Sequence, residues 1–168
     1  MSTPEFSRPV DERQLTARPV GIEASADERR ALARRFALVA IKSLKATVRF
    51  ERDGEAVRAQ GRLSAAIVQS CAISGEDLPV SIEEALVLRF VPERHPEDEE
   101  IELDAQDLDE IPFEGHEFDL GEAVAQSLAL AIDPYAIGPE ADRVRKEAGL
   151  GDEAASGPFA ALAALKKD

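Results

Sequence analysis

Residues 46–91 read ATVRFERDGEAVRAQGRLSAAIVQSCAISGEDLPVSIEEALVLRFV. From Val57 to Ile67, small or apolar residues occupy every odd position, and polar residues such as Arg58 and Arg62 occupy most even ones. This period of two is typical of a strand with one buried and one wet face, which favours antiparallel pairing. The stretch therefore predicts a β-sheet.

Two turns divide this stretch into three strands. Asp53-Gly54 separates residues 46–52 from the long run, and Asp-Gly is a strong signal for a tight hairpin. Ser74-Gly75 marks the second turn, and it leads into a strand over residues 80–91. The apolar side of that strand contains Val80, Ile82, Leu86, Leu88 and Phe90. Because the middle run is long for a single strand, we expect a bulge or a bend at Gly61.

Two capping patterns predict the main helices. Ser25 and Glu28 form a capping box for a helix near residues 26–41. The apolar stripe of this helix is expected to contain Leu32, Phe36, Val39 and Ala40. Asp119 is the expected N-cap of a second helix over residues 119–132, which Asp133-Pro134 ends.

These elements predict an α+β fold. We expect a curved antiparallel β-sheet, a meander with a long central hairpin, covered by the two main helices. Strands near residues 20–23 and 111–118 are expected to join the sheet. A short C-terminal helix that begins at Pro158 completes the fold.

The domain organisation follows from composition. We expect a single α+β domain over residues 1–135 with an acidic loop at 92–110, a flexible linker at 136–157 and the short helix at 158–168. A short helix within residues 140–148 is a further expectation. The apolar stripe of the last helix contains Phe159, Leu162 and Leu165, which are candidates for contact with a partner.

The charge of the chain is strongly negative and unevenly distributed. Its 168 residues carry a net charge of −14, which splits into +4 for residues 1–62 and −18 for residues 63–168. The total opposes non-specific adhesion to nucleic acid or to anionic membranes, so we expect neither a DNA partner nor a membrane partner. One cysteine and no long apolar stretch indicate a reducing, cytoplasmic location.

The sequence shows no catalytic motif. Cys71 ends the long run at an inward position, where a lone cysteine is most often a small buried side chain. His95 and His116 lack a nucleophile pattern, and the acidic loop lacks the spacing of a calcium site. We therefore expect no enzyme, no metal and no cofactor. The alternative is a small-molecule or metal-dependent enzyme that uses an acidic cleft.

Basic side chains in the first half are candidates for contact with RNA phosphate. Arg30 and Arg34 share one face of the first helix, and Lys42 and Lys45 follow it. The same character continues into the hairpin with Arg49, Arg52, Arg58 and Arg62. An ordinary solvated surface is the competing interpretation, and a shared face for these cations would strengthen the RNA hypothesis.

Several stretches together resemble the YceD family, the large ribosomal RNA subunit accumulation proteins. The likeness rests on Phe6-Ser7-Arg8-Pro9-Val10, Gln69-x-Cys71, Asp119-Leu120-Gly121-Glu122, Asp133-Pro134-Tyr135 and Pro158-Phe159-Ala160-x-Leu162-x-x-Leu165-Lys166. It implies a bacterial, cytoplasmic, non-enzymatic factor that supports synthesis, processing or stability of large-subunit (23S) ribosomal RNA. Ribosomal RNA or a ribosomal protein is then the expected partner.

The resemblance also bears on metal binding. Many members of the family carry Cys-x-x-Cys at the turn after the long strand, whereas this chain has Cys71 and Ser74 there. Two thiolates at this spacing form half of a structural zinc site and one does not, so we assign no metal. The family-motif positions Cys71, Asp119, Gly121 and Pro134 are interpreted as structural.

Overall fold

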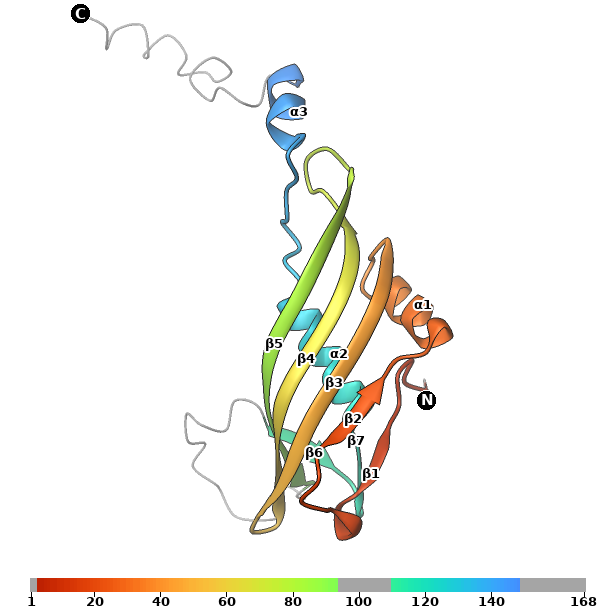
Figure 1. Ribbon diagram of the computed structural model, residues 1–168, viewed down its shortest axis with the longest axis vertical. Helices are drawn as coiled ribbons and strands as arrows, with labels where there is room; N and C mark the ends of the chain where they lie inside the picture. The colour runs from red at the N-terminus through yellow and green to blue at the C-terminus, as the bar shows by residue number, and fades with distance from the viewer. Residues whose placement is uncertain (1–2, 94–109, 149–168) are drawn as a thin grey trace, which may run out of the picture. The chain divides into compact units, whose positions relative to one another are not determined.

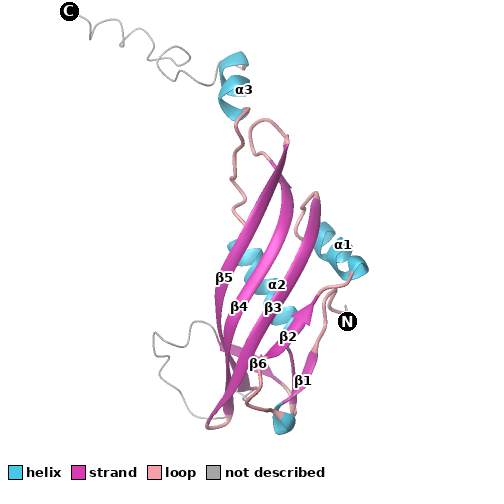
Figure 2. Ribbon diagram, in the orientation of Figure 1, coloured by secondary structure: helices cyan, strands magenta, loops and turns pink. Residues whose placement is uncertain are grey.

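The long alternating run forms the central strand of a five-stranded sheet with the order β2-β3-β4-β5-β6 (Figures 1 and 2). The strands are β2 (Val20–Glu23), β3 (Ala40–Asp53), β4 (Ala56–Ser70), β5 (Asp77–Pro92) and β6 (Glu110–Phe113). β3 pairs antiparallel with β2 and with β4, whereas β5 and β6 run parallel. The predicted α+β class is confirmed, and the parallel pair makes the sheet mixed.

The computed structural model describes residues 3–93 and 110–148, which belong to two units. The larger unit comprises Met1–Val68 with Pro79–Ile132, and the smaller comprises Gln69–Leu78 with Asp133–Asp168. Most of the predicted acidic loop and the whole predicted C-terminal helix, with Phe159, Leu162 and Leu165, lie outside the described residues. No helix within the described ranges is long and apolar enough to cross a membrane.

The larger unit also contains a two-stranded ribbon and two α-helices. Its remaining elements are β1 (Pro9–Asp11), the 3-10 helix η1 (Glu12–Gln14), α1 (Ala26–Arg35), β7 (Glu117–Asp119) and α2 (Leu120–Ala131). β1 pairs antiparallel with β7. The expected strand at 111–118 is therefore two strands, β6 and β7, because Gly115 at φ 67° turns the chain between them.

One face of the sheet and both helices enclose the core. α2 lies behind β3, β4 and β5 in Figure 1, and Leu32 of α1 joins the same buried cluster as Leu128 of α2. The largest fully buried side chains are Phe6, Phe90, Leu32, Leu44, Leu63, Ile67, Leu120, Leu128, Val48, Val57 and Val124. Neither α1 nor α2 lies on the face toward the viewer, and burial alternates along much of β4, so the predicted division into a wet and a buried face is confirmed.

Four phenylalanines join the ribbon to the main sheet. The ring of Phe118 in β7 stacks on that of Phe90 in β5, with 4.0 Å between the ring centres. The rings of Phe50 and Phe113 meet Phe118 edge to face, each at 5.7 Å. Aromatic contacts of this geometry add to the stabilisation from apolar burial, so the few aromatic residues concentrate where two sheets meet.

The first helix is shorter than predicted. It ends at Arg35, Phe36 caps it, and Ala37 turns the chain out of the helix at φ 54°. Val39 and Ala40 therefore do not belong to a helical stripe. These residues pair with β4 instead of continuing the helix. The Val39 N–H donates to the Val68 carbonyl at 2.9 Å, and β3 begins one residue later.

The central hairpin differs from its prediction in two details. Its loop residues are Gly54 and Glu55, and Asp53 is the last paired residue of β3. Glycine with φ 63° at the first loop position suits a type II′ turn. Of the bulge or bend predicted at Gly61, the bulge is wrong, because pairing is continuous there and the shift lies between Ile41 and Ser43. The bend stays a prediction.

Gly61 is required for a different reason. A Cβ at this position would lie 1.8 Å from the backbone oxygen of Thr47 on β3. The absence of a side chain thus permits close approach of two backbones in the middle of the sheet.

The carboxylate of Asp119 binds the N-terminal segment to the start of α2. Its Oδ1 accepts from the backbone N–H of Glu122 at 3.1 Å and from that of Arg8 at 2.8 Å. Its Oδ2 accepts from the Ser7 hydroxyl at 2.7 Å. A Cβ at Gly121 would lie 2.5 Å from the Phe6 carbonyl oxygen, so this glycine lets the segment lie directly on the helix.

Arg8 extends this connection to α1. Its guanidinium donates to both carboxylate oxygens of Glu28, at 2.7 and 2.9 Å, and to the Glu23 carbonyl at 2.9 Å. Glu28 also accepts from the Ser25 N–H, which completes the predicted capping box. The hydrogen bond from Arg8 is the main reason that the pKa of Glu28 is lowered to about 2.

The smaller unit is built around the turn after β4. The Cys71 N–H donates to the Glu76 carbonyl at 2.7 Å, and the Gln69 side chain donates to the Asp133 carbonyl at 2.7 Å. The unit continues into α3 (Ala141–Glu147), which confirms the expected short helix.

Truncation of core side chains tests this packing. Ile67 and Leu128 are 1% and 0% exposed. We expect Ile67→Ala and Leu128→Ala each to lower the free energy of unfolding by about 2–5 kcal/mol in urea titrations, because each leaves a cavity. The control Val87→Ala, at a position that is 56% exposed, should change it by less than about 0.5 kcal/mol. A similarly small loss for either core variant would contradict the assigned core.

Substitution of Asp119 tests the connection to the N-terminal segment. Asp119→Ala removes the N-cap and the acceptor for Ser7 and Arg8, so we expect a loss of about 1–3 kcal/mol in the free energy of unfolding. Asp119→Asn keeps an oxygen acceptor for both backbone donors, so it should lower the free energy of unfolding by less than Asp119→Ala does. Amide hydrogen exchange should show lower protection of Arg8 in the alanine variant than in the asparagine variant. Equal protection in both would contradict the assigned contact.

Candidate functional site

The uncovered side of β3 and β4 gathers polar and basic side chains. We name it the open face and define it by Lys45, Thr47, Arg49, Gln60, Arg62 and Ser64. The hairpin register places Lys45 opposite Ser64, Thr47 opposite Arg62 and Arg49 opposite Gln60. Side chains of directly paired residues lie on the same face of a sheet, so the alternation of each strand brings all six together.

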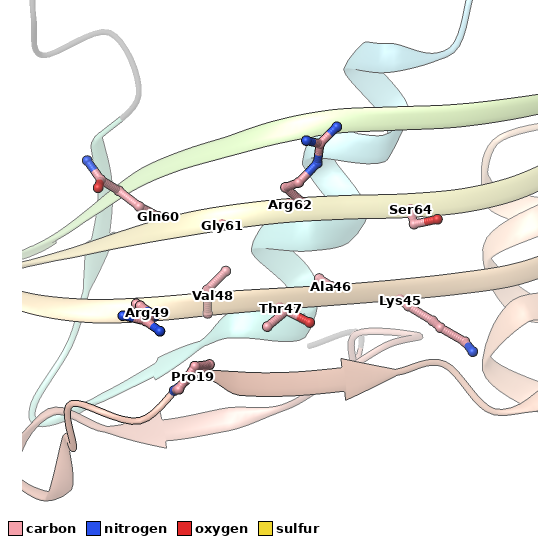
Figure 3. Close-up of a pocket in the computed structure, with 10 residues that line it drawn as sticks. All are labelled: Pro19, Lys45, Ala46, Thr47, Val48, Arg49, Gln60, Gly61, Arg62 and Ser64. Carbon is pink, nitrogen blue, oxygen red and sulfur yellow. The ribbon is translucent and has the colours of Figure 1, made fainter.

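The open face surrounds a shallow hollow of about 630 Å³ (Figure 3). β3 and β4 form its floor, and Pro19, just before β2, lies at its side. In Figure 3 the side chains of Lys45 and Arg62 extend from neighbouring strands. The hollow thus combines an accessible floor with cations and hydroxyl or amide groups from two strands.

The cations of the open face are weakly compensated. Lys45 lies 3.7 Å from the carboxylate of Glu23, and both side chains are well exposed. Within residues 3–93 and 110–148, no carboxylate forms an ion pair with Arg49 or Arg62. The two arginines are diagonal neighbours across the ladder, a geometry that separates the residues by about 7–8 Å and their Cβ atoms by somewhat less. Two uncompensated guanidinium groups at this spacing attract an anion with several charges.

Acidic groups border this surface on both sides, because Glu23 of β2 lies beside Lys45. The carboxylate of Glu83 on β5 accepts from the Ser64 hydroxyl at 2.8 Å. The positive part of the sheet therefore covers β3 and β4 and ends at β5.

The structure separates the basic residues that the sequence grouped. Arg30 and Arg34 are exposed on α1, and Arg30 bonds to Asp27 of the same helix. Lys42 is exposed beside the bulge of β3, and Lys45 lines the hollow. A binding role for these residues stays a prediction.

Arg49 and Arg62 are basic in the sequence, but their positions along the chain alone do not place them in one site. The Asp53-Gly54 turn predicts that they share a face, because the length of the loop sets the register of the hairpin. Either placement of a two-residue loop pairs odd positions of β3 with even positions of β4, which puts Arg49 and Arg62 on one face. The register of a tight hairpin was thus the signal that identifies this surface.

A second unusual environment surrounds Cys71 in the smaller unit. The expected burial is confirmed, because the side chain is 4% exposed. Its sulfur accepts from the backbone N–H groups of Gly138 at 3.2 Å, Ser74 at 3.3 Å and Ile73 at 3.5 Å. Burial, the largest single effect, raises the pKa of the thiol. The Ser74 hydroxyl and the three N–H groups together outweigh it, and the pKa falls from 9.0 to about 7.

Ser74 occupies the second position of the Cys-x-x-Cys pattern and serves the sulfur as a donor. Within the described residues, no group of three or more histidine, cysteine, aspartate or glutamate side chains is placed to hold a metal ion. The arrangement stabilises a thiolate, a property that the sequence did not indicate because Gly138 is remote from Cys71 in the chain.

The pH dependence of stability tests this environment. The folded-state pKa of about 7 lies below the ordinary 9.0, so the unfolded chain binds more protons between these values. We expect the stability of the wild type relative to Cys71→Ala to rise from pH 7 to pH 9 and to be lost as the pH falls through about 7. Urea titrations across this range measure the difference. Ser74→Ala should reduce the increase in stability with pH, because it removes a donor to the sulfur. If the stability difference between the wild type and Cys71→Ala does not change with pH, the low pKa is refuted.

Comparison with known proteins identifies the family. A family model described as "Large ribosomal RNA subunit accumulation protein YceD" matches residues 59–166, more than half of the chain. No curated protein and no solved structure matches this chain. The matched range includes most of β4, the turn at Cys71 and the whole of α2. The chain therefore belongs to the YceD family of large ribosomal RNA subunit accumulation proteins.

Proposed function

We propose that this protein supports the accumulation of large-subunit ribosomal RNA by binding RNA at the open face, without catalysing a reaction. The family description points to ribosomal RNA. The observation that carries the proposal is the shared face of Lys45, Arg49 and Arg62 around an accessible hollow. RNA phosphates are the multiply charged anions that such a surface suits.

The chemistry of the open face favours binding over catalysis. Arginine presents a planar fork of donors that matches phosphate oxygens, and lysine adds a mobile cation. Thr47, Gln60 and Ser64 add hydroxyl and amide groups, which bond to phosphates, to ribose hydroxyls or to base edges. These groups hold a nucleic acid chain in place. An enzyme that uses the acidic segment is the alternative.

The negative net charge restricts where RNA can bind to the protein. A chain of charge −14 repels RNA over most of its surface, and only a local positive region reverses this repulsion. The contact is therefore restricted to a short stretch of RNA rather than a broad coat. Within this proposal the protein acts on synthesis, processing or stability of 23S RNA by occupying such a stretch.

Two double variants with the same change of charge test the surface. We expect Arg49→Glu with Arg62→Glu to weaken binding of a large-subunit RNA transcript at least about tenfold, because two phosphate contacts become repulsions. The slope of log affinity against log salt should fall by about 2, one for each lost contact. Fluorescence anisotropy over a salt series measures both quantities.

The control is Arg30→Glu with Arg34→Glu on α1, which changes the net charge equally. It should keep the wild-type salt slope. A fall in slope only for this α1 variant would move the RNA contact to the helix, and no change in either variant would reject direct RNA binding at both surfaces. Pull-down from lysate with and without ribonuclease then separates RNA-mediated from protein-mediated association.

A further inference from the structure

Charged and uncharged polar groups alternate at the centre of the open face. Thr47 lies directly opposite Arg62, and Arg49 lies directly opposite Gln60 in the next row of the hairpin. The two arginines therefore occupy one diagonal of a quadrilateral, and Thr47 and Gln60 occupy the other, as Figure 3 shows. A ligand that contacts both arginines thus also passes over a hydroxyl and an amide group.

The hydroxyl of Thr47 and the amide of Gln60 are available to a ligand. Both residues are exposed, and within residues 3–93 and 110–148 neither side chain forms a hydrogen bond with another protein group. Gly21, the partner of Thr47 on β2, adds no side chain, and even a Cβ there would lie 3.9 Å from the Thr47 Oγ1. Both groups can donate and accept, as the ribose 2′-hydroxyl does.

The aromatic side chains of β3 and β5 lie on the opposite side of the sheet. Phe50 and Phe90 are buried in the core, and the positions that define the open face are all non-aromatic. Tyr135, which is strongly exposed, belongs to the smaller unit. Single-stranded nucleic acids are typically held by stacking of unpaired bases on aromatic side chains. The open face lacks the groups that this mode of binding uses.

A double-stranded RNA helix presents the groups that the open face can bind. Its bases are paired and stacked in the interior, whereas phosphates and 2′-hydroxyls are displayed at its wide, shallow minor groove. Arg49 and Arg62 suit the phosphates, and Thr47 and Gln60 suit the hydroxyls beside them. A DNA duplex offers the phosphates without the 2′-hydroxyls.

We propose that the open face binds the sugar–phosphate backbone of double-helical RNA, with Arg49 and Arg62 on phosphates and with Thr47 and Gln60 on ribose 2′-hydroxyls. The proposal rests on the proposed function, which assigns RNA to this face, and it names the form of RNA. Arginine also stacks on unpaired bases, so a single strand held by the same arginines is the competing ligand. The two modes differ in which ligand binds more tightly.

Four labelled ligands of related sequence test the proposal on the full-length chain. An RNA duplex of about 16 base pairs, a length that double-stranded RNA-binding domains span, is compared with each of its strands and with the corresponding DNA duplex. In fluorescence anisotropy the RNA duplex should bind at least about tenfold more tightly than either strand and at least about threefold more tightly than the DNA duplex. Equal or tighter binding of a single strand would overturn the proposal. Equal binding of the two duplexes, which carry the same charge, would overturn it as well.

Variants of the uncharged pair locate the contact with ribose. Thr47→Val with Gln60→Ala should abolish the preference for the RNA duplex over the DNA duplex. The slope of log affinity against log salt should stay unchanged, because no contact between a cation and a phosphate is lost. The control Gln126→Ala, at an exposed position of α2 on the other side of the sheet, should keep the preference. A preference that the double variant also keeps would overturn the proposal.

The outcomes separate this proposal from the proposed function. If the single strands bind most tightly and Arg49→Glu with Arg62→Glu abolishes that binding, RNA binding at the open face stands and the duplex proposal is overturned. If none of the four ligands binds, both are overturned. Circular dichroism melting of each variant checks that the fold is kept, and the comparison of the four ligands uses the wild type alone.

Discussion

The carboxylate of Asp119 is the point at which three parts of the larger unit meet. It starts α2 by accepting from Glu122, and it binds the N-terminal segment through Ser7 and the Arg8 backbone. Arg8 then holds Glu28, so the start of α1 depends on the same contact. Charge-assisted hydrogen bonds are stronger than neutral ones, and a group that serves several elements orders all of them together.

This connection explains why both helices lie on one face of the sheet. The N-terminal segment passes over α2 at Gly121, where even a methyl group would meet the Phe6 carbonyl. With Phe6 fully buried beneath it, the segment fastens α1 and α2 to the same side. The opposite side of β3 and β4 then stays accessible. A stretch of the chain that resembles the family thus has a structural role.

The sequence predicted the elements that depend on local pattern. The capping box of α1, the N-cap of α2, the alternation of Val57–Ile67 and the central hairpin all describe neighbours in the chain, and all are found in the structure. It did not predict features that depend on partners far away. The end of α1, the parallel pairing of β6 and the donors around Cys71 each require contact with a remote segment. The shared face of Arg49 and Arg62 could have been predicted from the sequence, because the register of a hairpin follows once its turn is assigned.

The positions of the charges reconcile an acidic chain with a ribosomal role. The uncompensated cations gather on β3 and β4, whereas Glu83 and Glu84 lie on β5 at the edge of the same sheet. Carboxylates repel RNA phosphate, whereas the arginines of the open face attract it. A negative total charge is therefore compatible with the RNA binding that we propose for the open face, because the cations there are concentrated locally.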